Sequence, residues 1–150
     1  MTGRPAPPFT LRDQHHQPVA LHDFRGRKAV LLVFYPFAFS RTCTGELAEI
    51  RDNLALYQNE TVQVLTVSCD SVYAHKVWAE QEKFTFPLLA DFWPHGETAR
   101  AYDAFDPGGG FANRGTYLVD RAGMIRFAEL LGPGEARDQS VWRAALDTLD

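Results

Sequence analysis

The sequence has few of the features that would assign it to a specialised class of protein. Its 150 residues contain only two cysteines, Cys43 and Cys69, too few for the disulfide framework of a small secreted domain. Residues 1–5 lack the apolar stretch of a secretory signal, and no run of 18 apolar residues predicts a membrane-spanning helix. The 15 basic residues are scattered and outnumbered by 19 acidic ones, which argues against nucleic-acid binding. We therefore expect a cytoplasmic protein with no nucleic-acid or membrane partner.

The sequence indicates neither a metal site nor a nucleotide-binding loop. The triple glycine at 108–110 lacks the Lys-Ser/Thr pair of a phosphate-binding loop. We interpret 106–110 as a flexible loop, with a contribution to a dimer contact as the alternative. The five histidines show no metal-ligand spacing with the cysteines: His15, His16, His22, His75 and His95. We expect no metal and no cofactor.

Hydrophobic patterning predicts one α/β domain over residues 1–150. With 45% hydrophobic residues, the chain is long enough to form one core. Apolar runs predict strands at 9–11, 19–21, 29–35, 62–67, 87–89, 116–120 and 124–130. Helical periodicity predicts helices at 41–57, 71–83 and 137–149. This order is typical of a thioredoxin-like fold, with a central mixed β-sheet flanked by helices and an N-terminal β-hairpin extension.

Cys43 occupies a position that favours a reactive thiol. It falls in the first turn of the predicted helix 41–57, shortly after a buried strand that ends at Pro36. Free backbone N–H groups and the positive end of the helix dipole stabilise a thiolate there, so we expect a pKa below the usual value of about 8.5. Cys43 also begins the apolar stripe of the helix, which directs its sulfur toward a partly enclosed pocket. Such a thiolate is a nucleophile, although position alone leaves open a small core residue.

The residues around Cys43 resemble the signature of the peroxiredoxin family. Residues 36–43, PFAFSRTC, contain the family's proline, a Ser or Thr four positions later, and its peroxidatic cysteine three positions after that. Glu46 also matches a position that the family usually fills with glutamate. Further matches follow in the family's order at 6–11 (APPFTL), at 67–71 (VSCDS) with His75, Lys76 and Trp78, and at 113–120 (NRGTYLVD). Segments 84–89 and 91–96 are most similar to the AhpE-like one-cysteine peroxiredoxins of actinobacteria.

This resemblance implies a thiol-dependent peroxidase for antioxidant defence. Its substrates would be hydrogen peroxide and organic hydroperoxides, with peroxynitrite as a further candidate. The Cys43 thiolate attacks one peroxide oxygen and becomes sulfenic acid. Ser40 and nearby backbone N–H groups bind the peroxide oxygens, and Arg114 stabilises the thiolate and orients the substrate. Pro36 walls the pocket and limits access of water.

Each of these residues also has a structural interpretation. Pro36 ends a strand, and Ser40 is suited to cap a helix. Taken alone, Arg114 is a candidate for a surface salt bridge. The resemblance implies that Glu46 is a structural hydrogen-bond partner of the site arginine, so we do not count it as catalytic.

The sulfenic acid must be reduced by a second thiol, and the chain offers only Cys69. By strand alternation Cys69 shares a face with Leu65 and Val67, so we interpret it as a buried, inert thiol; the alternative is that it resolves the sulfenic acid. We expect a one-cysteine cycle with an external thiol reductant. The resemblance implies mycothiol with a mycoredoxin, or a thioredoxin-like protein, and a homodimer that forms near the active site.

Two other functions compete with the peroxidase. A thioredoxin-type thiol–disulfide oxidoreductase needs Cys-x-x-Cys, whereas Cys43 is followed by TGE, and the usual proline before the strand is missing where residues 114–116 stand. A peroxide sensor or chaperone-like redox switch would use the same cysteine without turnover. The combination of Pro36, Ser40 and Arg114 favours the peroxidase.

Overall fold

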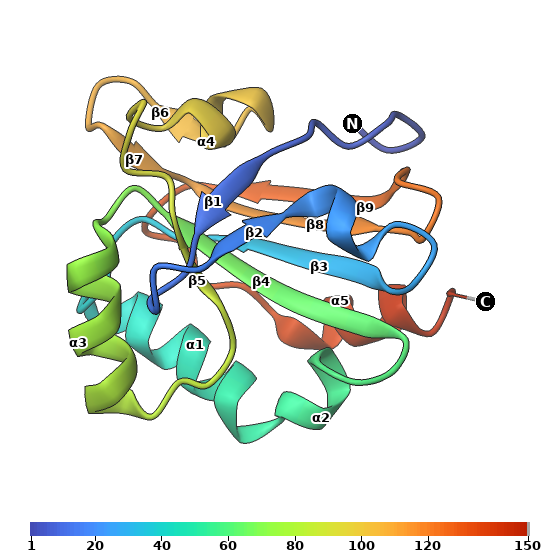
Figure 1. The fold of residues 1–150 in the computed structure, drawn as a ribbon, viewed down its shortest axis with the longest axis horizontal. Helices are drawn as coiled ribbons and strands as arrows, with labels where there is room; N and C mark the ends of the chain where they lie inside the picture. Colours follow the sequence, from blue (N-terminus) through green and yellow to red (C-terminus); the bar gives the residue numbers. More distant parts are fainter. Residues whose placement is uncertain (150) are drawn as a thin grey trace.

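A seven-stranded mixed sheet forms the centre of the molecule in the computed structural model (Figure 1). The structure describes residues 1–149, so residue 150 of the expected 1–150 domain lies outside the described residues. The strand order is β2-β1-β5-β4-β3-β8-β9. In chain order the strands are β1 (Thr10–Arg12), β2 (Pro18–Ala20), β3 (Ala29–Phe34), β4 (Val62–Ser68), β5 (Leu88–Ala90), β8 (Arg114–Val119) and β9 (Ile125–Leu131).

The strand pairings confirm the expected thioredoxin-like arrangement. β3, β4 and β5 run parallel, while β8 pairs antiparallel with both β3 and β9. The N-terminal hairpin of β1 and β2 joins the sheet through an antiparallel bridge from β1 to β5. All six residues of β3 are buried, because helices and loops cover both faces of the sheet centre.

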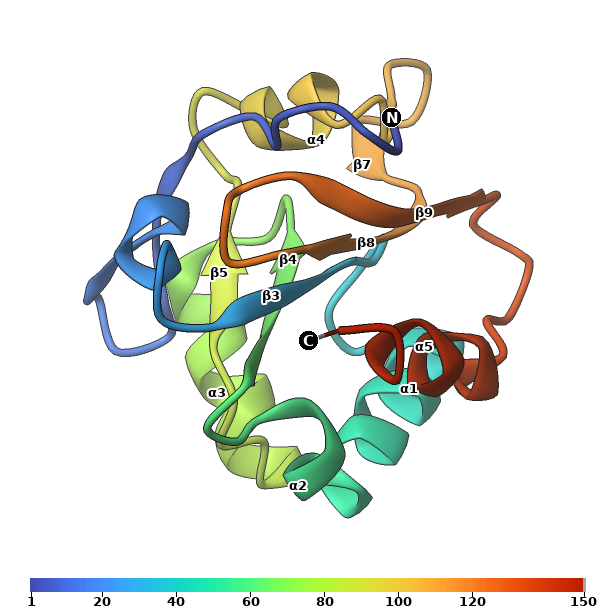
Figure 2. The same ribbon diagram turned by 90° about the vertical axis from the view of Figure 1, so that its right-hand side faces the viewer.

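Two layers cover the sheet, and each encloses a hydrophobic core (Figure 2). One layer contains α1 (Arg41–Asp52), α2 (Leu54–Tyr57), α3 (Val72–Glu82) and α5 (Gln139–Leu146). The other contains the N-terminal segment, α4 (Glu97–Ala101) and the small ribbon of β6 (Phe105–Asp106) and β7 (Phe111–Ala112). A short 3-10 helix, η1 (Leu21–Phe24), links β2 to β3. The longest helix among residues 1–149 has 12 residues, and none is long and apolar enough to cross a bilayer.

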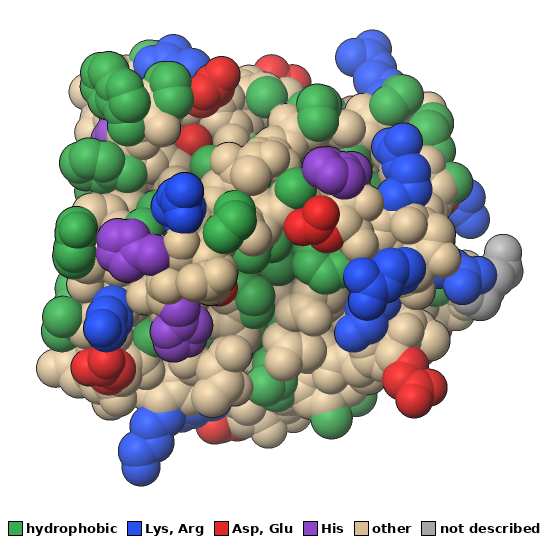
Figure 3. All heavy atoms as spheres, viewed as in Figure 1, with side chains coloured by type: hydrophobic (Ala, Val, Ile, Leu, Met, Phe, Trp, Pro, Cys, Tyr) green, Lys and Arg blue, Asp and Glu red, His purple; other side chains and the backbone are tan. Residues whose placement is uncertain are grey.

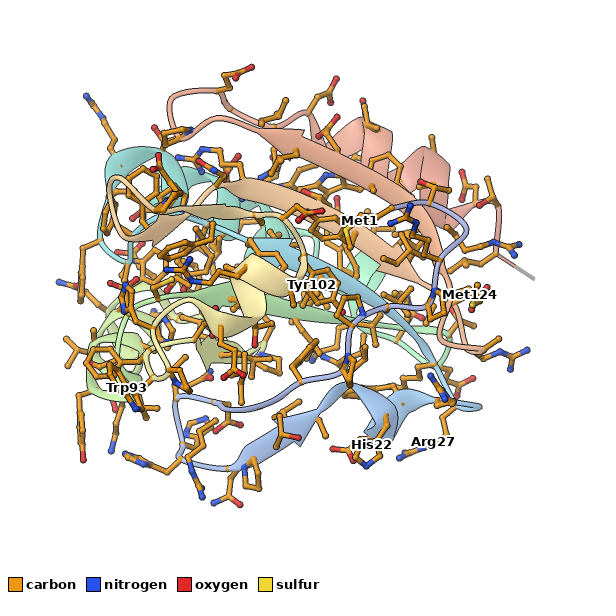
Figure 4. The ribbon with its side chains drawn as sticks, turned by 90° about the horizontal axis from the view of Figure 1, so that it is seen from above. Met1, His22, Arg27, Trp93, Tyr102 and Met124 are labelled. Carbon is orange, nitrogen blue, oxygen red and sulfur yellow. The ribbon has the colours of Figure 1, made fainter. Side chains whose placement is uncertain are left out.

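Tyr102 lies at the centre of the layer that contains α4, and Trp93 lies at its edge (Figure 4). The Tyr102 hydroxyl donates to the Pro7 carbonyl at 2.7 Å, and its own carbonyl accepts from the Tyr117 hydroxyl at 2.6 Å. These bonds fix the N-terminal segment and α4 to the sheet. The Trp93 side chain, by contrast, is 82% exposed.

The predicted helix 41–57 is divided at Asn53 into α1 and α2. The Asn53 side chain donates to the Glu49 carbonyl at 2.9 Å, in competition with the helical backbone bonds. The helix α4 and the β6–β7 ribbon were not predicted, because segments of five and two residues are too short for periodicity to reveal. The other predicted helices and strands are present, with ends shifted by a few residues.

Candidate active site

Cys43 lies in the first turn of α1, as predicted, and its side chain is 0% exposed. Ser40 is the N-cap residue, and its Oγ accepts a hydrogen bond from the Cys43 N–H at 3.3 Å. The Ser40 carbonyl accepts from the Thr44 N–H at 2.9 Å and so begins the helix. Ser40 therefore caps α1, as expected, and the cap holds its hydroxyl against the backbone of Cys43. The sequence predicted a partly enclosed pocket around Cys43, whereas the structure buries its side chain completely.

The segment between β3 and α1 carries Pro36 and sets the direction in which α1 starts. Pro36 is buried two residues after the end of β3. Phe39 has a φ of 70°, an unfavourable left-handed conformation for a residue other than glycine. The Ala38 N–H donates to Asp70 Oδ2 at 2.8 Å, which ties this segment to the end of β4.

Arg114 is buried at the start of β8 and is not a surface residue. Its Nη1 forms an ion pair with Glu46, and its Nε donates to the Pro133 carbonyl at 3.0 Å. Glu46 follows Cys43 by three residues in α1, so their side chains lie on the same face of the helix. The structure thereby brings the Arg114 guanidinium to the second turn of α1, where Glu46 is its structural partner as the resemblance implied.

A second buried arginine, Arg137, completes this cluster and was missed in the sequence. Its backbone N–H and Nε donate to Glu46 Oε2 at 3.0 and 3.2 Å, and its Nη2 donates to Glu46 Oε1 at 2.8 Å. Its Nη1 reaches the Gly115 carbonyl and Thr116 Oγ1 of β8, both at 3.2 Å. A weak sequence signal existed, because a cation at the start of the predicted helix 137–149 opposes the helix dipole.

Two arginines and one carboxylate leave this buried cluster with a net positive charge. Burial alone would raise the pKa of Glu46, but the hydrogen bonds and charge of Arg137, together with the charge of Arg114, lower it. Glu46 therefore stays ionised and holds both guanidinium groups. The cluster lies one helical turn along α1 from Cys43.

Cys69 lies in a different environment from Cys43. It follows β4 and packs in the core on the α4 side of the sheet, whereas Cys43 belongs to the core on the α1 side. Burial raises the pKa of Cys69 to about 12, and the negative charges of Asp91 and Asp70 add to the effect. Both cysteines are free thiols. The interpretation of Cys69 as a buried, inert thiol agrees with this geometry.

Polar contacts link four side chains at the segment that carries Pro36: Tyr35, His75, Ser68 and Asp70. His75 Nε2 lies 2.7 Å from Ser68 Oγ and 3.1 Å from the Tyr35 hydroxyl, and Ser68 Oγ donates to Asp70 Oδ2 at 2.7 Å. Burial lowers the pKa of His75 to about 4, although Asp70 opposes this shift. Burial raises the pKa of Tyr35, the Ser68 contact lowers it, and the charge of Asp70 raises it further.

Comparisons with known proteins agree with this geometry. The profile of the AhpC/TSA family matches residues 2–128. The chain is 53% identical over 147 residues to alkyl hydroperoxide reductase E of Mycobacterium tuberculosis, which covers 98% of this chain and 96% of that protein. Alkyl hydroperoxide reductase C of Staphylococcus epidermidis is 32% identical over 142 residues, or 89% of this chain and 74% of that protein.

Solved structures show the same fold. The crystal structure of AhpC from Enterococcus faecalis has a TM-score of 0.87 and 30% sequence identity, with 99% of this chain and 93% of that chain covered. The reduced 2-Cys peroxiredoxin of Plasmodium vivax has a TM-score of 0.88 over 97% of this chain and 80% of that chain. Its sequence identity is 24%, so it supports the fold alone.

Proposed function

Since this chain belongs to the AhpC/TSA family, the peroxiredoxins, and is a thiol-dependent peroxidase that reduces hydroperoxides, we propose that Cys43 is its peroxidatic nucleophile. One observation carries the assignment: Cys43 starts α1 on the same helical face as Glu46, which holds two buried guanidinium groups. Free N–H groups at a helix start and nearby positive charge stabilise negative charge on the reacting atoms. Cys69 has neither.

The proposed reaction is an in-line displacement at a peroxide oxygen. The Cys43 thiolate forms a bond to one oxygen, and the O–O bond breaks with its electron pair on the other oxygen. The leaving alkoxide or hydroxide takes a proton to become an alcohol or water, and Cys43 is left as sulfenic acid. Arg114 stabilises the negative charge as it moves from sulfur to the leaving oxygen, and Ser40 orients the substrate. Pro36 limits access of water to the sulfenic acid.

An external thiol completes the cycle in this proposal. It attacks the sulfenic sulfur and releases water, which gives a mixed disulfide that a second thiol then reduces. The positions of the two cysteines support an external reductant, because the sheet separates Cys69 from Cys43. Similarity to the mycobacterial relative supports mycothiol with a mycoredoxin, and a thioredoxin-like protein is the other candidate.

We also propose that the protein is a homodimer. Hydrophobic side chains gather along the edge formed by α3 and the α4 region (Figure 3). The large exposed apolar residues on α3 and on the loops before α1 and α4 are Phe37, Phe39, Tyr73, Val77, Phe92 and Trp93. A second copy that covered them would remove this surface from water. Analytical ultracentrifugation tests the dimer, and Trp93→Glu should shift it toward monomer.

The whole chain forms one peroxiredoxin domain in this proposal, and we place it in the cytoplasm. The single sheet shared by both cores supports the first statement. The two unpaired thiols support the second, because reducing compartments preserve free cysteine. Fractionation of cells that express the tagged protein tests the location.

Stopped-flow mixing with hydrogen peroxide, followed by intact-mass analysis, tests the catalytic assignment. The wild-type thiol should be oxidised orders of magnitude faster than free cysteine, and one equivalent of peroxide should add one oxygen atom. A Cys43→Ser variant should lose the fast phase. Loss of two protons without gain of oxygen would instead show that Cys69 resolves the sulfenic acid within the chain.

A further inference from the structure

The segment that carries Pro36 and Ser40 packs its aromatic side chains on Trp78 and Phe111 but makes few backbone hydrogen bonds to the rest of the protein. Among residues 1–149, its backbone N–H groups make three bonds: Tyr35 N–H to the Val67 carbonyl at 3.0 Å, Ala38 N–H to Asp70 Oδ2 at 2.8 Å, and Ser40 N–H to the Phe37 carbonyl at 3.4 Å. The first lies at the end of the strand, and the last lies within the segment. Of these three bonds, the one from Ala38 to the Asp70 carboxylate is therefore the one that holds the middle of the segment to the rest of the protein.

The same Asp70 oxygen is itself held in place. Ser68 is buried and donates its hydroxyl proton to Asp70 Oδ2 at 2.7 Å. Because Ser68 has only this proton, its 2.7 Å contact with His75 requires that His75 Nε2–H is the donor. His75 Nε2 also contacts the Tyr35 hydroxyl at the start of the segment.

We propose that Asp70 is a positioning residue for peroxide reduction, an inference that rests on the proposed function of Cys43. One oxygen of the Asp70 carboxylate accepts from the Ala38 N–H and from the Ser68 hydroxyl, and Ser68 in turn accepts from His75. Ala38 lies two residues before the Ser40 cap of α1. Asp70 therefore controls where Ser40 and the first turn of α1 lie relative to the buried arginines.

The conformation of the segment explains why such a tether matters. Phe39, between Ala38 and Ser40, has a φ of 70°, a left-handed conformation that is unfavourable for a residue with a side chain. Without the Ala38 tether, this residue can relax and shift Ser40 and Cys43. Displacement by about 1 Å at a reacting group can lower a rate by about 100-fold.

The test compares Asp70→Ala, Asp70→Leu and Asp70→Asn in the full chain. Alanine and leucine remove the acceptor, and leucine also preserves the volume, so the test does not depend on one variant alone. Asparagine keeps a carbonyl oxygen with two lone pairs for Ala38 and Ser68. Stopped-flow gives the second-order rate of oxidation by hydrogen peroxide. Alkylation of Cys43 by iodoacetamide gives thiolate reactivity that does not depend on peroxide alignment.

We expect Asp70→Ala and Asp70→Leu to lower the peroxide rate about 10- to 100-fold, with a much smaller fall in the alkylation rate. Asp70→Asn should stay within about threefold of the wild type in both assays. Asp91→Ala is the matched control, because Asp91 is a buried carboxylate that accepts from the Thr98 and Ala99 N–H groups of α4 at 3.1 and 2.8 Å. It should lower the melting temperature and leave the peroxide rate unchanged.

Three results would overturn the inference. The first is a wild-type peroxide rate in Asp70→Ala or Asp70→Leu. The second is an equal fall of the peroxide and alkylation rates in these two variants. The third is a peroxide rate of Asp70→Asn as low as that of Asp70→Ala. A wild-type protein that reacts with peroxide no faster than free cysteine contradicts the proposed role of Cys43 instead, so the two failures can be told apart.

Discussion

The two cysteines are both buried, yet the sheet separates them into different electrostatic environments. Cys43 begins a helix, and two arginines that share one carboxylate lie one turn along it. Cys69 follows a strand on the other face, where burial and the charges of Asp91 and Asp70 raise its pKa to about 12. Burial by itself does not decide whether a thiol reacts. We attribute the proposed reactivity of Cys43 to the sign of the nearest buried charge and to the free N–H groups of a helix start.

The largest expected effect comes from replacing each of the two cysteines in turn with serine. Cys43→Ser should abolish rapid oxidation by peroxide, while Cys69→Ser should keep the wild-type rate within about twofold, because a thiol with a pKa of about 12 is almost entirely protonated at pH 7. Stopped-flow fluorescence measures both. A Cys69→Ser variant that folds but reacts slowly with peroxide would contradict the interpretation of Cys69 as an inert thiol.

The next largest effect concerns the carboxylate that holds the arginine cluster. Glu46→Gln should lower the free energy of unfolding by about 3–5 kcal/mol, because two buried guanidinium groups lose their charged partner. The folded-state pKa of Glu46 is lowered, so its contribution is present above the unfolded pKa of about 4.3 and is lost as the pH falls through the folded pKa. Urea unfolding at pH 7 and below pH 4 measures the difference, which should shrink in acid.

Replacement of Arg114 tests how much a buried guanidinium contributes to the reaction proposed for Cys43. Arg114→Ala should lower the peroxide rate about 100- to 1,000-fold, the usual cost of losing one donor that stabilises transition-state charge. Arg114→Lys keeps the charge but loses the planar fork that reaches both Glu46 and the Pro133 carbonyl, so it should recover only part of the rate. An Arg114→Ala variant with the wild-type rate would assign the electrostatic role to Arg137 instead.

The smallest predicted effect concerns acid stability and His75. Its folded pKa of about 4 lies below the unfolded value of about 6.5, so stability should decline as the pH falls from 6.5 to 4, by about 3 kcal/mol in total. His75 faces Asp70, which opposes the shift, and the Tyr35 hydroxyl, which stays neutral in this range. Urea unfolding of His75→Asn at the two pH values should show a smaller decline than the wild type. Equal declines would mean that other groups set the acid dependence.

The parts of the site that are local in sequence could be predicted, and the parts that depend on distant pairing could not. The strand at 29–34, the Ser40 cap and the place of Cys43 follow from hydrophobic patterning and turn chemistry over about 15 residues. The arginine of β8 was found only through its resemblance to a family motif. Arg137 was missed because it meets Glu46 across 91 positions, and no periodicity in either segment encodes that contact. The role of Asp70 likewise depends on a contact across 32 positions.

The contact between Arg137 and Glu46 has a consequence for how the enzyme is made. The cysteine, its serine cap and the first arginine are translated well before the segment that completes the charge cluster on Glu46. The charge cluster on Glu46 is therefore complete only after the segment that carries Arg137 has been made and has folded back onto α1.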